Sequence, residues 1–223
     1  QFADLFNPKL QGEELDLAIQ KWQEDFLSAT SLARVALSKR LVSASSDGVL
    51  VNLPNGETRK MASGPSSELA KAVVEQFAKN FMKDPAVILM SESAKKLLLK
   101  DDDLCQAIGF DVDVSTVLPD LILAELGEKQ PIIVFIECVA SDGPINDRRK
   151  MELLELAAKA GYKEKDCVCV TVFRDRSNSV SRKLVPSISW GTFIWYASEP
   201  DNIIYLREGN EERAVSIGGF LEL

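Results

Sequence analysis

Apolar residues recur at helical spacing in several parts of the chain, as expected of amphipathic helices. The clearest case begins at Ser66, where Ser67 could cap the helix, and its apolar side consists of Leu69, Val73, Phe77 and Phe81. The same spacing predicts further helices at residues 13–42 (one long or two short), at 93–99, directly after the aspartates at 101–103, and at 147–159, where Gly161 ends the helix.

Short apolar runs between these helices are typical of buried strands. They lie at residues 86–90, 117–125, 131–137 and 167–173, and two more apolar, aromatic stretches follow at 193–196 and 203–206. Residues 43–65 are rich in Ser, Gly, Pro and Asn around an apolar segment at 49–53, which indicates a small β-turn element or a linker. From Ser66 to Phe173 the predicted order is helix, strand, strand, strand, helix, strand.

The second and third of these strands flank a short Gly-containing stretch, which predicts a β-hairpin. A turn centred on residues 128–129 places Asp120 directly opposite Glu137, with Cβ atoms roughly 4.5–5.5 Å apart. Two like charges opposed on an apolar sheet destabilise it, and burying them costs several kcal/mol more. A divalent cation held between the carboxylates would remove both problems. The hairpin therefore predicts a metal site of the kind that nucleases use.

Composition indicates a chain of 223 residues, 46% hydrophobic, with one large domain or one domain plus a helical appendage. No apolar run approaches the roughly 20 residues that a membrane helix needs, and no signal peptide is visible. Because the chain begins with Gln1, we expect it to be a piece of something longer, attached to a further N-terminal segment. The cysteines lack zinc-site spacing, and we expect reduced core thiols in a cytoplasmic protein; they are Cys105, Cys138, Cys167 and Cys169.

Histidine is absent from the sequence. This excludes Ser-His-Asp and Cys-His catalysis and any mechanism with histidine as general base. The net charge of −8 is unfavourable for nucleic-acid binding, but residues 141–190 carry 10 basic and 7 acidic residues. This basic stretch could contact phosphates, or it could form a solvated surface of mixed charge.

The order of elements, with Pro119-Asp120 beginning one strand and Glu137 ending the next, resembles the PD-(D/E)xK nuclease core. More narrowly, the chain resembles the endonuclease domain of the BsuBI/PstI family of type II restriction enzymes, over roughly residues 15–206. The segments that carry this resemblance are 118–123 (Leu-Pro-Asp-Leu-Ile-Leu), 135–145 (Phe-Ile-Glu-Cys-Val-Ala-Ser-Asp-Gly-Pro-Ile), Arg148-Arg149, Glu152-Leu153 and Phe173.

The resemblance implies an α/β fold with a mixed central sheet flanked by helices. It implies an N-terminal helical segment and linker at residues 1–62 and a nuclease domain at 63–223. It further implies Mg²⁺-dependent hydrolysis of double-stranded DNA, with the intact protein acting as a homodimer. The competing hypothesis is a catalytically degenerate nuclease-fold module that binds DNA or a partner protein without cleaving.

Metal ligands follow from the same resemblance. Asp120 and Glu137 would bind Mg²⁺, for which Mn²⁺ could substitute, and the backbone carbonyl of Cys138 would be a further ligand. Glu75, on the first core helix, is either another acidic residue of the site or a solvent-facing residue. Asp120 and Glu137 could instead form a structural pair with basic partners.

The chain departs from the PD-(D/E)xK motif at Val139, where that motif has a lysine. Either a basic residue reaches the site from elsewhere or the domain is catalytically weak. The resemblance favours Arg149 for this role, whereas Lys150 is chemically closer to the missing lysine. Ser141 and Asp142 would support the site or simply make the turn. The residues expected to contact DNA, with surface ion pairs as the alternative, are Arg148, Arg149, Arg174, Arg176 and Lys183, whereas a core position is expected for Trp190, Trp195 and Tyr196.

Overall fold

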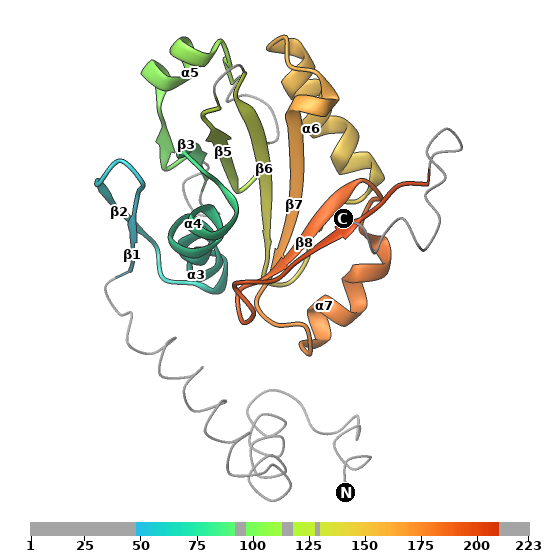
Figure 1. The fold of residues 1–223 in the computed structure, drawn as a ribbon. Coiled ribbons are helices and arrows are strands. Elements are labelled where there is room, and N and C mark those ends of the chain that lie inside the picture. The colour runs from blue at the N-terminus through green and yellow to red at the C-terminus, as the bar shows by residue number, and fades with distance from the viewer. Residues whose placement is uncertain (1–47, 92–96, 113–117, 128–129, 210–223) are drawn as a thin grey trace, which may run out of the picture. The chain divides into compact units, whose positions relative to one another are not determined.

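Seven strands in the described part of the chain form one mixed β-sheet, which Figure 1 shows at the centre of the fold. The structure is a computed structural model that describes residues 48–91, 97–112, 118–127 and 130–209. The strands lie side by side in the order β4-β3-β5-β6-β7-β8-β9. Their bounds are Pro85–Met90 (β3), Leu99–Lys100 (β4), Leu121–Glu125 (β5), Ile132–Val139 (β6), Cys167–Phe173 (β7), Thr192–Tyr196 (β8) and Ile203–Leu206 (β9).

Antiparallel and parallel pairing meet at β6. This strand pairs antiparallel with β5 and parallel with β7, and β7 pairs parallel with β8. A parallel neighbour requires a crossover connection, which is supplied here by α6 (Asp147–Lys159). The carboxyl end of β6 therefore leads into the N-terminus of α6, and side chains at these two places can meet.

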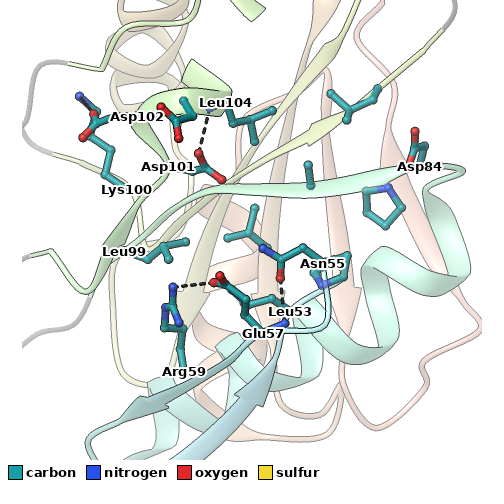
Figure 2. Close-up of a pocket in the computed structure, with 16 residues that line it drawn as sticks. Leu53, Asn55, Glu57, Arg59, Asp84, Leu99, Lys100, Asp101, Asp102 and Leu104 are labelled. Carbon is teal, nitrogen blue, oxygen red and sulfur yellow. Dashed lines mark hydrogen bonds and ion pairs between the residues drawn. The ribbon is translucent and has the colours of Figure 1, made fainter. Parts of the chain in front are cut away.

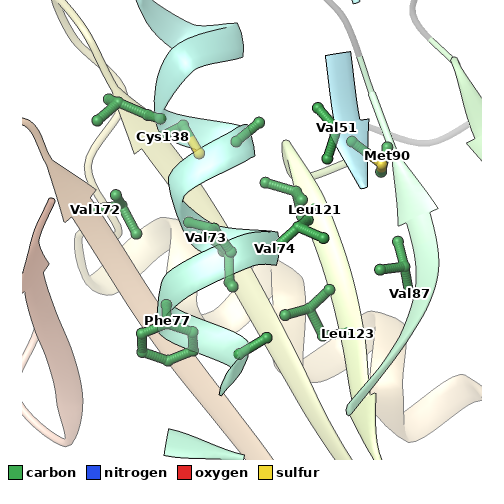
Figure 3. Close-up of a cluster of buried hydrophobic side chains, with 14 of the residues drawn as sticks. Val51, Val73, Val74, Phe77, Val87, Met90, Leu121, Leu123, Cys138 and Val172 are labelled. Atoms are coloured by element: carbon green, nitrogen blue, oxygen red, sulfur yellow. The ribbon is translucent and has the colours of Figure 1, made fainter. Parts of the chain in front are cut away.

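A continuous helical segment covers one face of the sheet, made of α3 (Pro65–Ala72), the π-helical turn η2 (Val73–Phe77) and α4 (Ala78–Phe81). Figure 3 shows its apolar side facing β5 and β6. The hairpin of β1 (Val49–Asn52) and β2 (Thr58–Met61) adds its buried side chains to the same cluster. Of the two alternatives for residues 43–65, the structure thus contains the β element, and the hairpin belongs to the same compact unit as the sheet.

The opposite face of the sheet packs against α6 and α5 (Asp102–Ile108). Along β6, Val134, Ile136 and Cys138 belong to the cluster under α3, whereas Ile133 and Phe135 belong to the cluster under α6. This alternation of period 2 places Glu137 on the α6 face. A third cluster, next to α7 (Ser179–Leu184), contains Val139 and Phe173. The remaining short helices are η3 (Glu164–Asp166) and η4 (Val185–Ser187).

The predicted α/β architecture and most predicted elements are confirmed, and the order from Ser66 to Phe173 holds except for the edge strand β4, which was not predicted. The hairpin register is confirmed as well, because Leu121 pairs with Ile136 and Ile122 with Phe135. Residues 13–42, and the turn at 128–129, lie outside the described residues.

Two expectations were wrong, and one helix was missed. Leu99, at the end of a predicted helix over 93–99, belongs to the edge strand β4, which pairs with β3; residues 92–96 lie outside the described residues. The helix α7 was not predicted, because its six residues are too few to show a helical period. Trp190 was expected in the core but is 61% exposed, since it lies in the loop before β8 rather than on a strand. Trp195 and Tyr196 are buried, as expected.

The four cysteines are free thiols; Cys105, Cys138 and Cys169 are buried, and Cys167 is partly buried. Within the described ranges, no helix combines the length and the hydrophobicity needed to cross a bilayer.

Candidate active site

Asp120 and Glu137 meet where β5 begins and β6 nears its end. The β5–β6 ladder pairs Leu121 with Ile136, so the residues one step beyond are next to each other. The backbone N–H of Cys138 donates to Oδ2 of Asp120 at 2.7 Å, which fixes that carboxylate against β6. On the other side, the backbone N–H of Ser91 donates to the carbonyl oxygen of Asp120 at 2.8 Å. The Asp120 backbone and side chain are thus held from both neighbouring strands.

Arg149 approaches this pair from the first turn of α6. Asn146 caps that helix, since its side chain accepts a hydrogen bond from the backbone N–H of Arg149 at 2.9 Å. The Nε of Arg149 donates to Oε1 of Glu137 at 2.8 Å, and the two side chains are only 14% and 12% exposed. Its Nη1 also lies 3.3 Å from Oε2 of Glu152. The largely buried guanidinium of Arg149 therefore contacts Glu137 and places a positive charge beside the carboxylate pair.

Burial, followed by the charge of Asp120, raises the pKa of Glu137 to about 7 against the opposing effect of Arg149. Burial also raises the pKa of Asp120, although the hydrogen bond from Cys138 and the charge of Arg149 act in the other direction. Two partly buried carboxylates with one nearby cation leave an excess of negative charge, which a divalent cation would compensate.

The donor set fits a hard divalent cation. Carboxylate oxygens are the ligands that Mg²⁺ prefers, and this ion usually keeps several waters, so two carboxylates suffice. Among the described residues, no group of three or more His, Cys, Asp or Glu side chains is placed to hold a metal ion.

Glu75 is accordingly not gathered with Asp120 and Glu137. Its Oε1 accepts hydrogen bonds from the backbone N–H of Asn52 at 2.9 Å and from Nζ of Lys71 at 2.8 Å. Partial burial would raise its pKa, but the hydrogen bonds from Lys71 and Asn52 lower it overall. In this structure Glu75 joins the β1–β2 hairpin to the helix that covers the sheet.

Of the three basic residues at the start of α6, only Arg149 contacts Glu137 in the described structure. Lys150 points elsewhere, because its Nζ donates to the carbonyl oxygen of Trp190 at 3.1 Å and lies 3.5 Å from Glu208. Arg148 is exposed and pairs with Glu152 at 2.9 Å. The geometry therefore favours Arg149, and not Lys150, beside the carboxylates.

Val139 is 2% exposed and packs with Phe173, Ile188, Ile194 and Tyr196. A lysine at this position would have to place its ammonium group among apolar side chains, which costs free energy unless the charge is paired. Val139 therefore belongs to the third core cluster and supplies no basic group to the site.

The other expected site residues are spread along the same edge of the sheet. Ser141 and Asp142 are exposed and hydrogen-bonded to each other at 3.2 Å. Arg176 lies over the ring of Tyr196 at 5.5 Å and forms an ion pair with Glu199 at 3.2 Å. This ion pair was the alternative to a DNA contact for Arg176. Arg174 follows β7, and Lys183 is exposed on α7.

Two residues that support the site were missed in the sequence. Asn146 could have been found, since Asn directly before a helical run is a common N-cap. Thr171 could not, because only the parallel register places it beside Glu137. Its buried Oγ1 accepts from the backbone N–H of Ile145 at 3.1 Å, which ties the chain before α6 to β7.

A hollow of about 460 Å³ opens beside Glu137 and Arg149 and is also lined by Pro144 and Arg148. A larger hollow of about 640 Å³ lies between the β1–β2 hairpin, β3 and α5 (Figure 2). Its charged groups serve the local structure: Asp101 caps α5 by accepting from Leu104, and Glu57 pairs with Arg59. Of these two hollows, the one of about 460 Å³ is therefore the candidate active site, because Glu137 and Arg149 line it.

A sequence model of the BsuBI/PstI restriction endonuclease domain matches residues 49–209, a range that includes Asp120, Glu137 and Arg149. The chain belongs to this family. It is 26% identical over 203 residues to the type II restriction enzyme BsuBI of Bacillus subtilis, with 88% of this chain and 61% of BsuBI covered. The solved structure of the SdaI restriction endonuclease is similar with a TM-score of 0.63 at 27% identity, covering 83% of this chain and 56% of SdaI. The chain thus spans about three-fifths of the length of these two similar proteins.

The raised pKa of Glu137 predicts an unusual pH dependence of stability. Its folded-state pKa of about 7 exceeds the ordinary 4.5, so between these values the folded state binds more protons than the unfolded state. In metal-free buffer the free energy of unfolding should therefore rise by on the order of 2 kcal/mol as the pH falls from about 8 to about 5.5. Carboxyls with a lowered pKa, such as Glu75, titrate below this window.

Urea unfolding with a chelator present, repeated across this pH range, measures the effect. Glu137→Gln is the matched control, because it keeps the shape of the side chain and removes the titration. Equal pH slopes in the parent and the variant would contradict the assignment to Glu137.

Proposed function

We propose that this chain is the catalytic domain of a type II restriction endonuclease that hydrolyses phosphodiester bonds of double-stranded DNA with Mg²⁺, or Mn²⁺ in its place. The observation that carries the proposal is the partly buried pair Asp120 and Glu137 with Arg149 in contact with Glu137. Family membership supports it, since the relatives are named as restriction enzymes.

Asp120 and Glu137 would hold the metal ion, and the backbone carbonyl of Cys138 could complete the set. When bound, the ion supplies polarisation of the scissile phosphate and a lowered pKa for an attacking water. The amide of Cys138 keeps one oxygen of Asp120 occupied, which leaves the other free to face the ion. Glu137 would ionise fully once the excess negative charge is compensated.

Arg149 would take over part of the role of the missing lysine. A guanidinium remains protonated, so it cannot accept a proton from water, but it can donate to Glu137 and to a phosphate oxygen at once. Its position at the first turn of α6 adds the partial positive charge of a helix N-terminus. Arg148, Arg174, Arg176 and Lys183 are proposed DNA contacts, and Ser141 and Asp142 support the turn before α6.

The alternative, a module that binds DNA or a partner without cleaving, also has a specific observation in its favour. Val139 supplies no basic group, and Arg149 forms an ion pair with Glu137 that could be purely structural. The two functions differ in one measurable property. Nicking of supercoiled plasmid that depends on Mg²⁺ and stops with a chelator supports the nuclease, whereas duplex binding without any cleavage in Mg²⁺ or Mn²⁺ supports the alternative.

We further propose that the intact protein carries a segment N-terminal to this chain, acts as a homodimer and works in the cytoplasm, where DNA is accessible. A symmetric site cut on both strands requires two active sites, which a two-fold axis provides. Sedimentation of the full-length protein with and without a duplex would test this, and a monomer that cuts both strands at one site would count against it.

A further inference from the structure

A third hollow, of about 250 Å³, is lined by Asp120 and by the N-terminus of the helical segment that begins at Pro65. Its lining combines Asp120 and Ser91 with the first turn of α3, including Gly64, Ser66 and Ser67. The helical segment continues through η2 and α4 to Phe81, so its peptide dipoles add over four turns or more.

The first backbone N–H groups of α3 donate to no acceptor within the helix. Gly64 occupies the cap position without a side-chain hydrogen bond, and Pro65 has no N–H. The first helical hydrogen bond is donated by Glu68 to the carbonyl oxygen of Gly64 at 3.1 Å. The backbone N–H groups of Ser66 and Ser67 precede it, and such groups need a partner outside the helix.

Ser67 supplies an independent sign of a ligand. Ser67 is only 6% exposed and lines the hollow, and no hydrogen bond of its hydroxyl occurs among the described residues. The hydroxyl oxygen is not sealed in the core, so it is reached from the hollow, where a water or a ligand would be its partner. A hydroxyl and backbone N–H groups at one helix start suit an oxyanion such as a phosphate.

Arg174 extends these donors along the sheet edge. It lines a neighbouring hollow of about 200 Å³, and Pro65 lines both this hollow and the one of about 250 Å³. No ion pair of its guanidinium occurs within the described ranges, in contrast to Arg176. The two hollows share Pro65, so they connect Asp120, the start of α3 and Arg174 in that order. A DNA strand with its successive phosphates would match this order.

We propose that the first turn of α3, Pro65–Ser67, binds a DNA backbone phosphate next to the one that Asp120 and Glu137 cleave. This inference rests on the proposed function, since Asp120 alone would repel an anion. It assigns Ser66 and Ser67 to binding rather than to chemistry. The phosphate would lie between the metal site and Arg174 and would fix the register of the cleaved strand.

The test introduces a negative charge where the phosphate would bind. Ser66→Asp should weaken duplex binding by about tenfold in Ca²⁺ buffer, where cleavage is suppressed. The slope of log affinity against log salt concentration should become shallower by about one, as expected when one phosphate contact is lost. The same substitution should maintain or raise the thermal midpoint, because Asp in a first helical turn is favourable. Ser67→Ala, which removes only the hydroxyl, should weaken binding by a few fold.

Gln76→Glu is the matched control, since it changes the charge equally on an exposed part of the same helical segment. Parent-like affinity and salt dependence in Ser66→Asp would overturn the proposal, even if the parent cleaves DNA. A parent that binds no duplex would instead remove the proposed function. In that case, shifts of the Ser66 and Ser67 amide signals with inorganic phosphate support the site, and unchanged signals overturn it.

Discussion

Replacing Asp120 by Asn or Glu137 by Gln is expected to lower the rate of DNA cleavage by at least ~10³-fold, because each carboxylate is half of the proposed cation site and that cation contributes several kcal/mol to the transition state. Single-turnover cleavage of a supercoiled plasmid at saturating Mg²⁺ measures the loss. Binding of Mn²⁺, followed by calorimetry, should weaken in parallel. Cleavage within tenfold of the parent rate in either variant would exclude that residue as a ligand.

The two variants also separate a metal site from a structural ion pair. In metal-free buffer Asp120→Asn should maintain or raise the thermal midpoint, because it removes one of two like charges while the Asn oxygen can still accept from Cys138. Glu137→Gln weakens the contact with Arg149 and should be close to neutral, since Glu152 remains as a partner. A drop of several degrees in both would indicate that the carboxylates serve the fold.

Arg149→Ala is expected to lower the cleavage rate by about 10²-fold, the low end of what a positioned catalytic group contributes. The reason is its contact with Glu137 at 2.8 Å, which places a fixed positive charge where charge would build up on the phosphate. Duplex affinity should fall much less, because one phosphate contact is a small part of the total. The loss should therefore appear in kcat rather than in KM.

Lys150→Ala is the control for this prediction. It removes the same charge from the adjacent residue, but its Nζ contacts the carbonyl of Trp190 and not the carboxylates. Its cleavage rate should remain within a few fold of the parent, although stability should fall slightly with the lost contacts. Equal losses in the two variants would mean that only the overall charge of the helix start matters. Arg149→Lys should recover part of the rate, whereas Val139→Lys should not, because Val139 is buried among apolar side chains.

The sequence by itself determined the sheet and the position of the carboxylate pair. Alternating burial requires a period of 2, and a hairpin with a short turn permits few registers, so Asp120 opposite Glu137 followed from the local pattern. The capped helix from residue 147 to 159 followed from its apolar spacing and from Gly161. These features depend on neighbours in the chain, which a single sequence displays.

Only the tertiary structure decided which basic residue joins the carboxylates. Arg149 and Lys150 are adjacent, but residues one step apart on a helix point about 100° away from each other, so the packing of α6 on the sheet sends Arg149 to Glu137 and Lys150 to the loop before β8. In the same way, the parallel pairing of β6 with β7 placed Thr171 beside Glu137, and the third core cluster enclosed Val139. Contacts between segments far apart in the chain leave no periodic signal in one sequence, because they depend on how complete elements pack together.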